Sequence, residues 1–146
     1  MVAEDLKNKL VFLDTAPLIY FIEGNSAYQQ ILKKLFVFND EGYFKFLTST
    51  VTLLEVLVKP LRDGETNVAD KYTSILTNAE GIDIFDITSV IAARAASLRA
   101  IYNLRTPDAL QVATAIQHNA DYFFTNDLRL QAIADIKVIT IEDLID

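Results

Sequence analysis

The feature that most constrains the fold is a regular alternation between short apolar segments and longer stretches with helical periodicity. The apolar segments have the length and composition of β-strands, and residues 10–13 (LVFL) contain no polar side chain. Such a run is typical of a strand buried on both faces of a parallel sheet. The expected strands are residues 10–13, 43–47, 82–87, 122–125 and 136–140. Because helical stretches separate them, the pattern predicts an α/β sandwich with a mostly parallel central sheet.

Capping and helix-breaking residues mark the ends of the helical stretches. Ser26 and Thr106 are expected N-caps, and Pro107 stands at the first helical position, where proline is favoured. Pro60 and Gly81 are expected to close the helices before them. The expected helices are residues 15–23, 26–38, 50–58, 69–78, 89–102, 106–118 and 128–134. No linker-like stretch or internal repeat interrupts the sequence, so we expect a single domain over residues 1–146.

Composition excludes several classes of function. The chain has no cysteine and one histidine, His118, which excludes disulfide scaffolds, thiolate zinc sites, iron–sulfur clusters and cysteine nucleophiles. Its 20 acidic and 13 basic side chains give a net charge of −7, which disfavours a protein that coats nucleic acids generally. The longest apolar run, residues 16–22, is far shorter than the roughly 20 residues that span a bilayer. We therefore expect a cytoplasmic protein whose chemistry depends on oxygen groups.

Four acidic side chains stand at positions that simple solvation does not explain. Asp14 and Asp127 directly follow apolar strands, at the carboxyl ends where parallel sheets bind ligands. Asp108 stands in the first turn of a helix, and Glu55 lies on or beside an apolar helix face. Each position also has a simpler explanation, because aspartates suit helix N-termini and a glutamate at the edge of an apolar stripe can reach water.

These four acids can converge on one rim of the sheet. Carboxylates within a few ångströms raise one another's pKa, so such a cluster persists mainly where a divalent cation neutralises it. Oxygen ligands with positions left for water suit Mg²⁺ or Mn²⁺. These ions commonly serve phosphate chemistry, because they stabilise the charged transition state and lower the pKa of a bound water. The acids therefore indicate metal-dependent phosphate chemistry.

Several segments of the chain resemble the PIN-domain ribonucleases, and within them the VapC-type toxins of bacterial and archaeal toxin–antitoxin pairs. The segments are residues 11–19 (VFLDTAPLI), 49–57 (STVTLLEVL), 104–115 (LRTPDALQVATA) and 123–127 (FFTND). Their order carries the resemblance over essentially the whole chain, and Asp-Ala-Leu in a late helix and Thr-Asn-Asp after a strand are its most specific parts. The resemblance implies a PIN-like three-layer α/β/α sandwich.

The resemblance also implies a function for the acids and their neighbours. The acids would form a quartet that holds Mg²⁺ or Mn²⁺ and activates water for the cleavage of RNA. Three polar neighbours of the acids would order water or a carboxylate: Thr15, Thr125 and Asn126. The implied partners are a second copy of the chain in a homodimer and an antitoxin whose C-terminal segment covers the active site. A basic tail on that antitoxin would complement an acidic cleft.

RNA binding depends mainly on phosphate contacts, so a chain with a net charge of −7 needs positive charge beside its active site. The candidates, which lie close in sequence to Glu55, Asp108 or Asp127, are Lys59, Arg62, Arg105 and Arg129. Each of them also fits ordinary solvated surface. His118 is expected near a helix end, where its charge is favourable, and is given no catalytic role.

Two other functions remain open from the sequence. A phosphoryl-transfer domain of the haloacid-phosphatase or receiver type also carries an aspartate after a buried strand. The haloacid enzymes need a second aspartate two residues later, where this chain has Ala16, and a receiver needs an acidic pair and a late lysine that are not evident. The other alternative is a catalytically degenerate PIN domain that acts as a protein-binding module, which would not explain why all four acids are retained.

Overall fold

The computed structural model describes residues 1–145, and its strands form one five-stranded sheet. Every pair of neighbouring strands in this sheet is parallel, in the order β3-β2-β1-β4-β5. The strands are β1 (Leu10–Leu13), β2 (Lys45–Ser49), β3 (Ile82–Phe85), β4 (Tyr122–Thr125) and β5 (Lys137–Thr140). The predicted α/β fold is confirmed, and the sheet is wholly rather than mostly parallel.

The strand order reverses at β1. The chain runs from β1 to β2 and β3 on one side, and then crosses back to form β4 and β5 on the other side. The backbone N–H of Asp14 donates to the carbonyl of Phe124 at 3.0 Å, which continues the pairing with β4 past the end of β1. In parallel sheets the crevice at such a reversal is where ligands bind. Asp14 therefore lies at the most favoured binding position of the fold.

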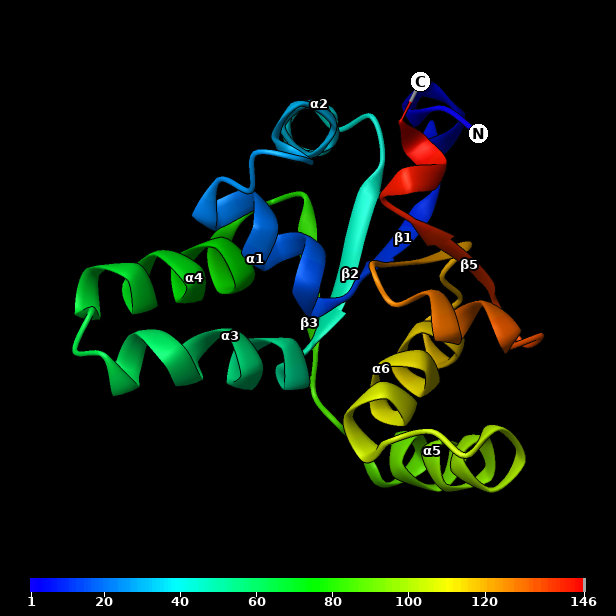
Figure 1. The fold of residues 1–146 in the computed structure, drawn as a ribbon. Helices are drawn as coiled ribbons and strands as arrows, with labels where there is room; N and C mark the ends of the chain where they lie inside the picture. Colours follow the sequence, from blue (N-terminus) through cyan, green and yellow to red (C-terminus); the bar gives the residue numbers. More distant parts are fainter. Residues whose placement is uncertain (146) are drawn as a thin grey trace.

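Two helical layers cover the sheet (Figure 1). Helices α1 to α4 pack on one face and α5 and α6 on the other, as the alternation along β1 requires. Val11 and Leu13 belong to the first core, whereas Phe12 points into the second and stacks on Phe123 with ring centroids 5.2 Å apart. The helices are α1 (Thr15–Glu23), α2 (Gln29–Asp40), α3 (Thr50–Arg62), α4 (Thr66–Asn78), α5 (Ser89–Tyr102) and α6 (Thr106–Gln117), with short 3-10 helices η1 (Ala3–Leu6), η2 (Leu128–Ala132) and η3 (Glu142–Leu144). This confirms the three-layer arrangement.

Several predicted helix ends differ in the structure: α4, for example, begins at Thr66 rather than at residue 69, and the segment predicted as a helix over 128–134 is the 3-10 helix η2. Helix α3 continues through Pro60, which is buried and stands in the last turn, so that its missing N–H removes only one helical bond. Helix α2 begins at Gln29 rather than at Ser26, because Asn25 instead accepts from the backbone N–H groups of Ala27 and Tyr28 and forms a separate turn.

Residue 106 is the first residue of α6, and Arg105 occupies the N-cap position that the sequence assigned to Thr106. The first turn of α6 is therefore not capped by a side chain, although Pro107 stands near its start as expected. Throughout residues 1–145, every helix is too short or too polar to cross a membrane.

Candidate active site

A cleft of about 540 Å³ beside the ends of β1 and β4 collects the predicted site residues. Its walls include the four acids Asp14, Glu55, Asp108 and Asp127, the polar residues Thr15, Thr125 and Asn126, and the two arginines Arg105 and Arg129. Ile19, Tyr20 and Leu128 add an apolar wall that the sequence did not indicate. Residues separated by more than 110 positions thus meet at one edge of the sheet, as the parallel topology predicts.

Asp14 is the innermost acid of the cleft. It caps α1 by accepting from the backbone N–H of Thr15 at 2.9 Å, and its second carboxylate oxygen accepts from the Thr125 hydroxyl at 2.8 Å. The pKa of Asp14 is raised to about 6, mainly by burial and also by the nearby charges of Asp108 and Glu55, against the lowering effect of the two hydrogen bonds. The same carboxylate of Asp14 therefore both caps α1 and lines the cleft.

Glu55 is held in the cleft by Thr15. The hydroxyl of Thr15 donates to Oε1 of Glu55 at 2.7 Å, which joins the start of α1 to the first half of α3. Its helical neighbours Leu54 and Val58 are 64 % and 51 % exposed, so the apolar stripe that marked Glu55 in the sequence is a surface stripe. The buried face of α3 is formed instead by Thr52, Val56 and Pro60. Glu55 lies between these two faces, next to the cleft.

Asp108 and Asp127 each face an arginine. Nε of Arg105 lies 3.2 Å from Oδ2 of Asp108. Asp127 accepts from Nε and Nη2 of Arg129 at 3.0 and 2.7 Å, and also from its backbone N–H at 3.0 Å. These bonds lower the pKa of Asp127 and raise that of Arg129. The rim of the cleft therefore alternates in charge, with two acids already paired with cationic side chains.

Thr125 connects the two aspartates that follow strands. Its hydroxyl donates to Asp14 and accepts from the backbone N–H of Asp127 at 3.1 Å. Asn126 is directed elsewhere, since its side-chain amide lies 3.4 Å from the hydroxyl of Tyr20. Of the three polar neighbours predicted from the sequence, Thr15 and Thr125 thus contact the acids directly, whereas Asn126 contacts the apolar wall.

Gln111 is a site residue that the sequence analysis missed. Its side-chain amide lies 3.4 Å from Oδ1 of Asp14 and 2.5 Å from Oγ1 of Thr52, and it accepts from the hydroxyl of Ser49. The three polar residues of this group, Gln111 on α6, Ser49 at the end of β2 and Thr52 on α3, are all buried. A signal was present in the sequence, because a glutamine three residues after Asp108 lies on the same helical face and interrupts the apolar run of residues 109–113.

The remaining sequence candidates lie outside this cleft. Lys59 and Arg62 are not among its lining residues, and Arg62 lies 3.9 Å from Asp63 beyond the far end of α3. The separation of Lys59 and Arg62 from the cleft follows from helix geometry, because each successive residue along α3 lies about 1.5 Å further from the sheet edge at which the helix begins. The ring of His118 stacks on Phe85, with centroids 3.6 Å apart, and His118 is not among the residues that line the cleft.

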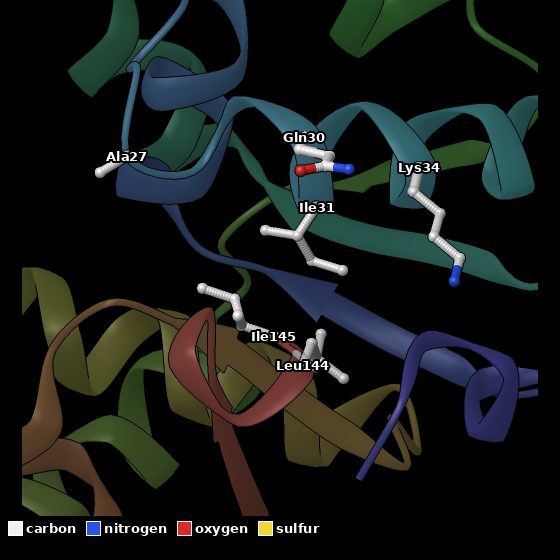
Figure 2. A pocket seen from close by; sticks show the side chains of 6 residues that line it. All are labelled: Ala27, Gln30, Ile31, Lys34, Leu144 and Ile145. Atoms are coloured by element: carbon white, nitrogen blue, oxygen red, sulfur yellow. The ribbon is translucent and has the colours of Figure 1, made fainter.

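A second hollow of about 290 Å³ lies between α2 and the C-terminal segment (Figure 2). Ile31 of α2 points across it toward Leu144 and Ile145. Lys34, on the same wall, forms an ion pair with Glu4 at 2.5 Å. Among residues 1–145, no carboxylate lines this hollow, whereas the predicted chemistry depends on such groups.

The backbone closely resembles those of several solved proteins. VapBC2 from Rickettsia felis, bound to a promoter DNA fragment, gives a TM-score of 0.71 at 16% identity, with 90% of this chain and 98% of that chain covered. A toxin–antitoxin complex from Klebsiella pneumoniae gives 0.68 at 25% identity, with 90% and 97% covered. VapC20 from Mycobacterium tuberculosis, a toxin that cleaves the sarcin–ricin loop, gives 0.68 at 15% identity, with 87% and 98% covered.

A search of curated protein sequences finds no match to this chain. The family model of the PIN domain, however, matches residues 11–136. The matched region extends from β1 to the turn before β5 and contains all four acids of the cleft. Because this match covers most of the sequence, the chain belongs to the PIN domain family.

Proposed function

We propose that this protein is a divalent-metal-dependent endoribonuclease that hydrolyses RNA phosphodiester bonds and acts as the toxin of a toxin–antitoxin pair. The observation that carries the proposal is the convergence of Asp14, Glu55 and Asp108 in one cleft, close enough for the last two to raise the pKa of the first. Membership of the PIN domain family, and the similarity to a toxin that cleaves RNA of the sarcin–ricin loop, support the same chemistry.

The donor set of the cleft fits Mg²⁺ or Mn²⁺. Its charged ligands are carboxylate oxygens, and His118, the one histidine of the chain, lies outside the cleft. Within residues 1–145, no three acidic, histidine or cysteine side chains are arranged to hold an ion jointly, and Asp108 and Asp127 are paired with arginines. We propose that Asp14 and Glu55 hold the ion from the inside and that the two aspartates turn from their arginines toward it.

The bound ion would lower the pKa of a water molecule and neutralise charge on the scissile phosphate. The chain itself orients the carboxylates for this task. Thr125 and the backbone of Thr15 fix the two oxygens of Asp14, and the Thr15 hydroxyl fixes one oxygen of Glu55, so that its other oxygen remains for a ligand. Arg105 and Arg129 stand on the rim with 70% and 74% of their side chains exposed, where they can bind backbone phosphates.

The direct test is incubation of the purified protein with RNA in Mg²⁺, in Mn²⁺ and in EDTA. We expect internal cleavage with either ion and none in EDTA. Expression of the wild-type chain should also inhibit growth, and co-expression of its antitoxin should relieve that inhibition. A protein that cleaves no RNA with either ion would contradict the proposal. If, in addition, no metal ion changed the melting temperature of that protein, the result would support the alternative of a catalytically degenerate PIN domain that acts as a protein-binding module.

Metal binding should be visible as thermal stabilisation. An ion present at about 100 times its dissociation constant stabilises the folded state by about 2.7 kcal/mol, which for a chain of this size raises the melting temperature by about 5–10 °C. We expect Mn²⁺ to produce such a rise in the wild type and a smaller rise in Asp108→Asn, measured by differential scanning fluorimetry. Asp83→Asn is the matched control, because Asp83 pairs with Lys45 at 3.0 Å on the edge of the sheet, away from the cleft residues.

The arginines of the rim should contribute to RNA affinity. We expect Arg129→Ala to weaken RNA binding and to reduce the slope of log affinity against log salt by about 0.7, the value for one phosphate contact on a single strand. Binding is measured by fluorescence anisotropy in an Asp14→Asn background, which prevents cleavage. Lys137→Ala is the control, since Lys137 is the first residue of β5, at the end of the strands opposite the cleft. Equal slopes for the two variants would show that Arg129 makes no phosphate contact.

We also propose the two protein partners that the resemblance implies. An antitoxin with a basic C-terminal tail would complement the acidic cleft of a chain with a net charge of −7.

A homodimer would cover the exposed aliphatic stripe of α3, where Leu54, Val58 and Leu61 recur one turn apart. Light scattering should give twice the mass of one chain, and the variant Val58→Asp should shift this toward the monomer. We also propose a cytoplasmic location and a single domain over residues 1–146, as the sequence analysis indicates.

A further inference from the structure

Gln111 is a buried polar side chain in contact with Asp14, although it does not line the cleft and no step of the proposed chemistry uses it. It is 1% exposed and lies on α6, one helical turn after Asp108. Its partners are Ser49 and Thr52, at the start of α3, and Asp14, at the start of α1. A buried amide costs stability unless all its polar atoms are bonded, so its placement here requires an explanation.

The hydrogen bonds around Gln111 fix the orientation of its amide. The hydroxyl oxygen of Ser49 already accepts from the backbone N–H of Val51 at 3.1 Å, as the N-cap of α3. The hydroxyl proton is therefore directed to the other neighbour, which must be the amide oxygen of Gln111. The amide nitrogen then faces Thr52 and Asp14. A reversed amide would place its oxygen against the carboxylate of Asp14, with two acceptors facing each other.

Asp14 is thus held by donors from three different elements. Thr15 donates from α1 and Gln111 from α6, both to Oδ1, and Thr125 donates from β4 to Oδ2. The Gln111 contact, at 3.4 Å, is the longest of the three, yet it is the one that connects Asp14 to the helices carrying Asp108 and Glu55. Gln111 therefore connects the segments that supply Asp14, Glu55 and Asp108.

We propose that Gln111 is a positioning residue, whose amide holds Asp14 in the orientation needed for metal binding and keeps α3 and α6 in register at the cleft. The use of Asp14 as a metal ligand rests on the proposed function, whereas the positioning itself does not. Side chains that orient metal ligands in this way typically account for a 10- to 100-fold effect on metal affinity or activity.

The test compares Gln111→Met with Thr114→Val. The first replacement keeps the length of the side chain and removes its amide. Thr114 is the matched control, because it is buried on the same helix and its hydroxyl donates to the carbonyl of Leu110 within that helix, at 2.7 Å. We expect Gln111→Met to raise the Mn²⁺ dissociation constant about 10-fold in calorimetry and to lower kcat for RNA, with KM changed less than about twofold. Thr114→Val should leave the Mn²⁺ dissociation constant, kcat and KM as in the wild type.

Ser49→Ala provides a second variant in case Gln111→Met does not fold. It removes the hydroxyl that orients the amide and should weaken Mn²⁺ binding in the same direction. Crystal structures of the variants give a readout that does not depend on activity: the Asp14 carboxylate should be turned or split between rotamers while the backbone is unchanged. An Asp14 side chain oriented as in the wild type, or unchanged Mn²⁺ affinity in the folded variants, overturns the proposal.

These measurements separate the inference from the proposed function. Wild-type protein that neither binds Mn²⁺ nor cleaves RNA would contradict the proposed function alone. The orientation of Asp14 in the variants would still decide whether Gln111 positions it. Conversely, an active wild type with an equally active Gln111→Met variant would preserve the function and exclude the positioning role.

Discussion

Replacing Asp14 with asparagine should abolish RNA cleavage, with a loss on the order of 10³-fold or more in kcat/KM. The change removes the charge of the innermost acid, which is the one held by three donors and placed where the strand order reverses. Asparagine preserves the size of the side chain, so the loss reports charge rather than packing. The measurement is the initial rate of cleavage of a labelled RNA at saturating Mn²⁺, together with the Mn²⁺ dissociation constant from calorimetry.

The matched control for Asp14→Asn is Asp121→Asn. Asp121 also bonds to β1, since its carboxylate accepts from the backbone N–H of Leu10 at 2.8 Å, but it lies at the opposite end of that strand from Asp14. Both variants remove one aspartate charge next to the central strand. We expect Asp121→Asn to cleave RNA at the wild-type rate. If Asp14→Asn retained more than about a tenth of the wild-type rate, Asp14 would not be a ligand of the catalytic ion.

The second large effect concerns stability in the absence of metal. The pKa of Asp14 in the folded protein is about 6, above its ordinary value of 3.8. Protonated Asp14 therefore favours the folded state, and the stability it contributes below pH 4 is lost as pH rises through about 6. The raised pKa corresponds to a loss on the order of 3 kcal/mol in the free energy of unfolding. Urea unfolding in EDTA between pH 4 and 7.5 measures it.

Two comparisons identify Asp14 as the source of this loss. In Asp14→Asn the fall between pH 4 and 6 should be absent. In the wild type, saturating Mn²⁺ should reverse it, because a bound cation favours the ionised carboxylate. Asp127 acts in the opposite direction and at lower pH, since its pKa is lowered by Arg129 and its contribution disappears as pH falls. Identical pH profiles for the wild type and Asp14→Asn would contradict the raised pKa of Asp14.

The parallel sheet and the positions of Asp14, Asp108 and Asp127 could be predicted because each depends on the local sequence pattern. A fully apolar run such as LVFL determines a buried parallel strand, and the residue after it must emerge at the carboxyl edge. Asp14 and Asp127 follow from this rule, and Asp108 follows from its place in the first turn of α6. Glu55 was identified from an apolar stripe that proved to be exposed, so its position was right although the reason was wrong.

The contacts between elements could not be predicted from local pattern. The bond from Thr15 to Glu55 joins residues 40 positions apart, and that from Gln111 to Asp14 joins residues 97 apart. Nearness in sequence was correspondingly misleading for Lys59, which lies one turn after Glu55 yet outside the cleft. Pro60 also shows that a helix-breaking residue expresses only a local preference, because the buried Pro60 stands in the last turn of α3, where its missing N–H removes one helical hydrogen bond.

The strand order has a consequence for the synthesis of this protein. Because β1 pairs with β4, the central strand keeps one open edge until residue 125 has been added to the growing chain. A nascent chain ending at α5 carries Asp14 and Glu55 but lacks Asp108 and the donors Gln111 and Thr125. Translation products of this length would therefore lack the assembled cleft. A chain built in this order completes its cleft only after residue 129 has been added, so that shorter products could not carry out the proposed nuclease chemistry.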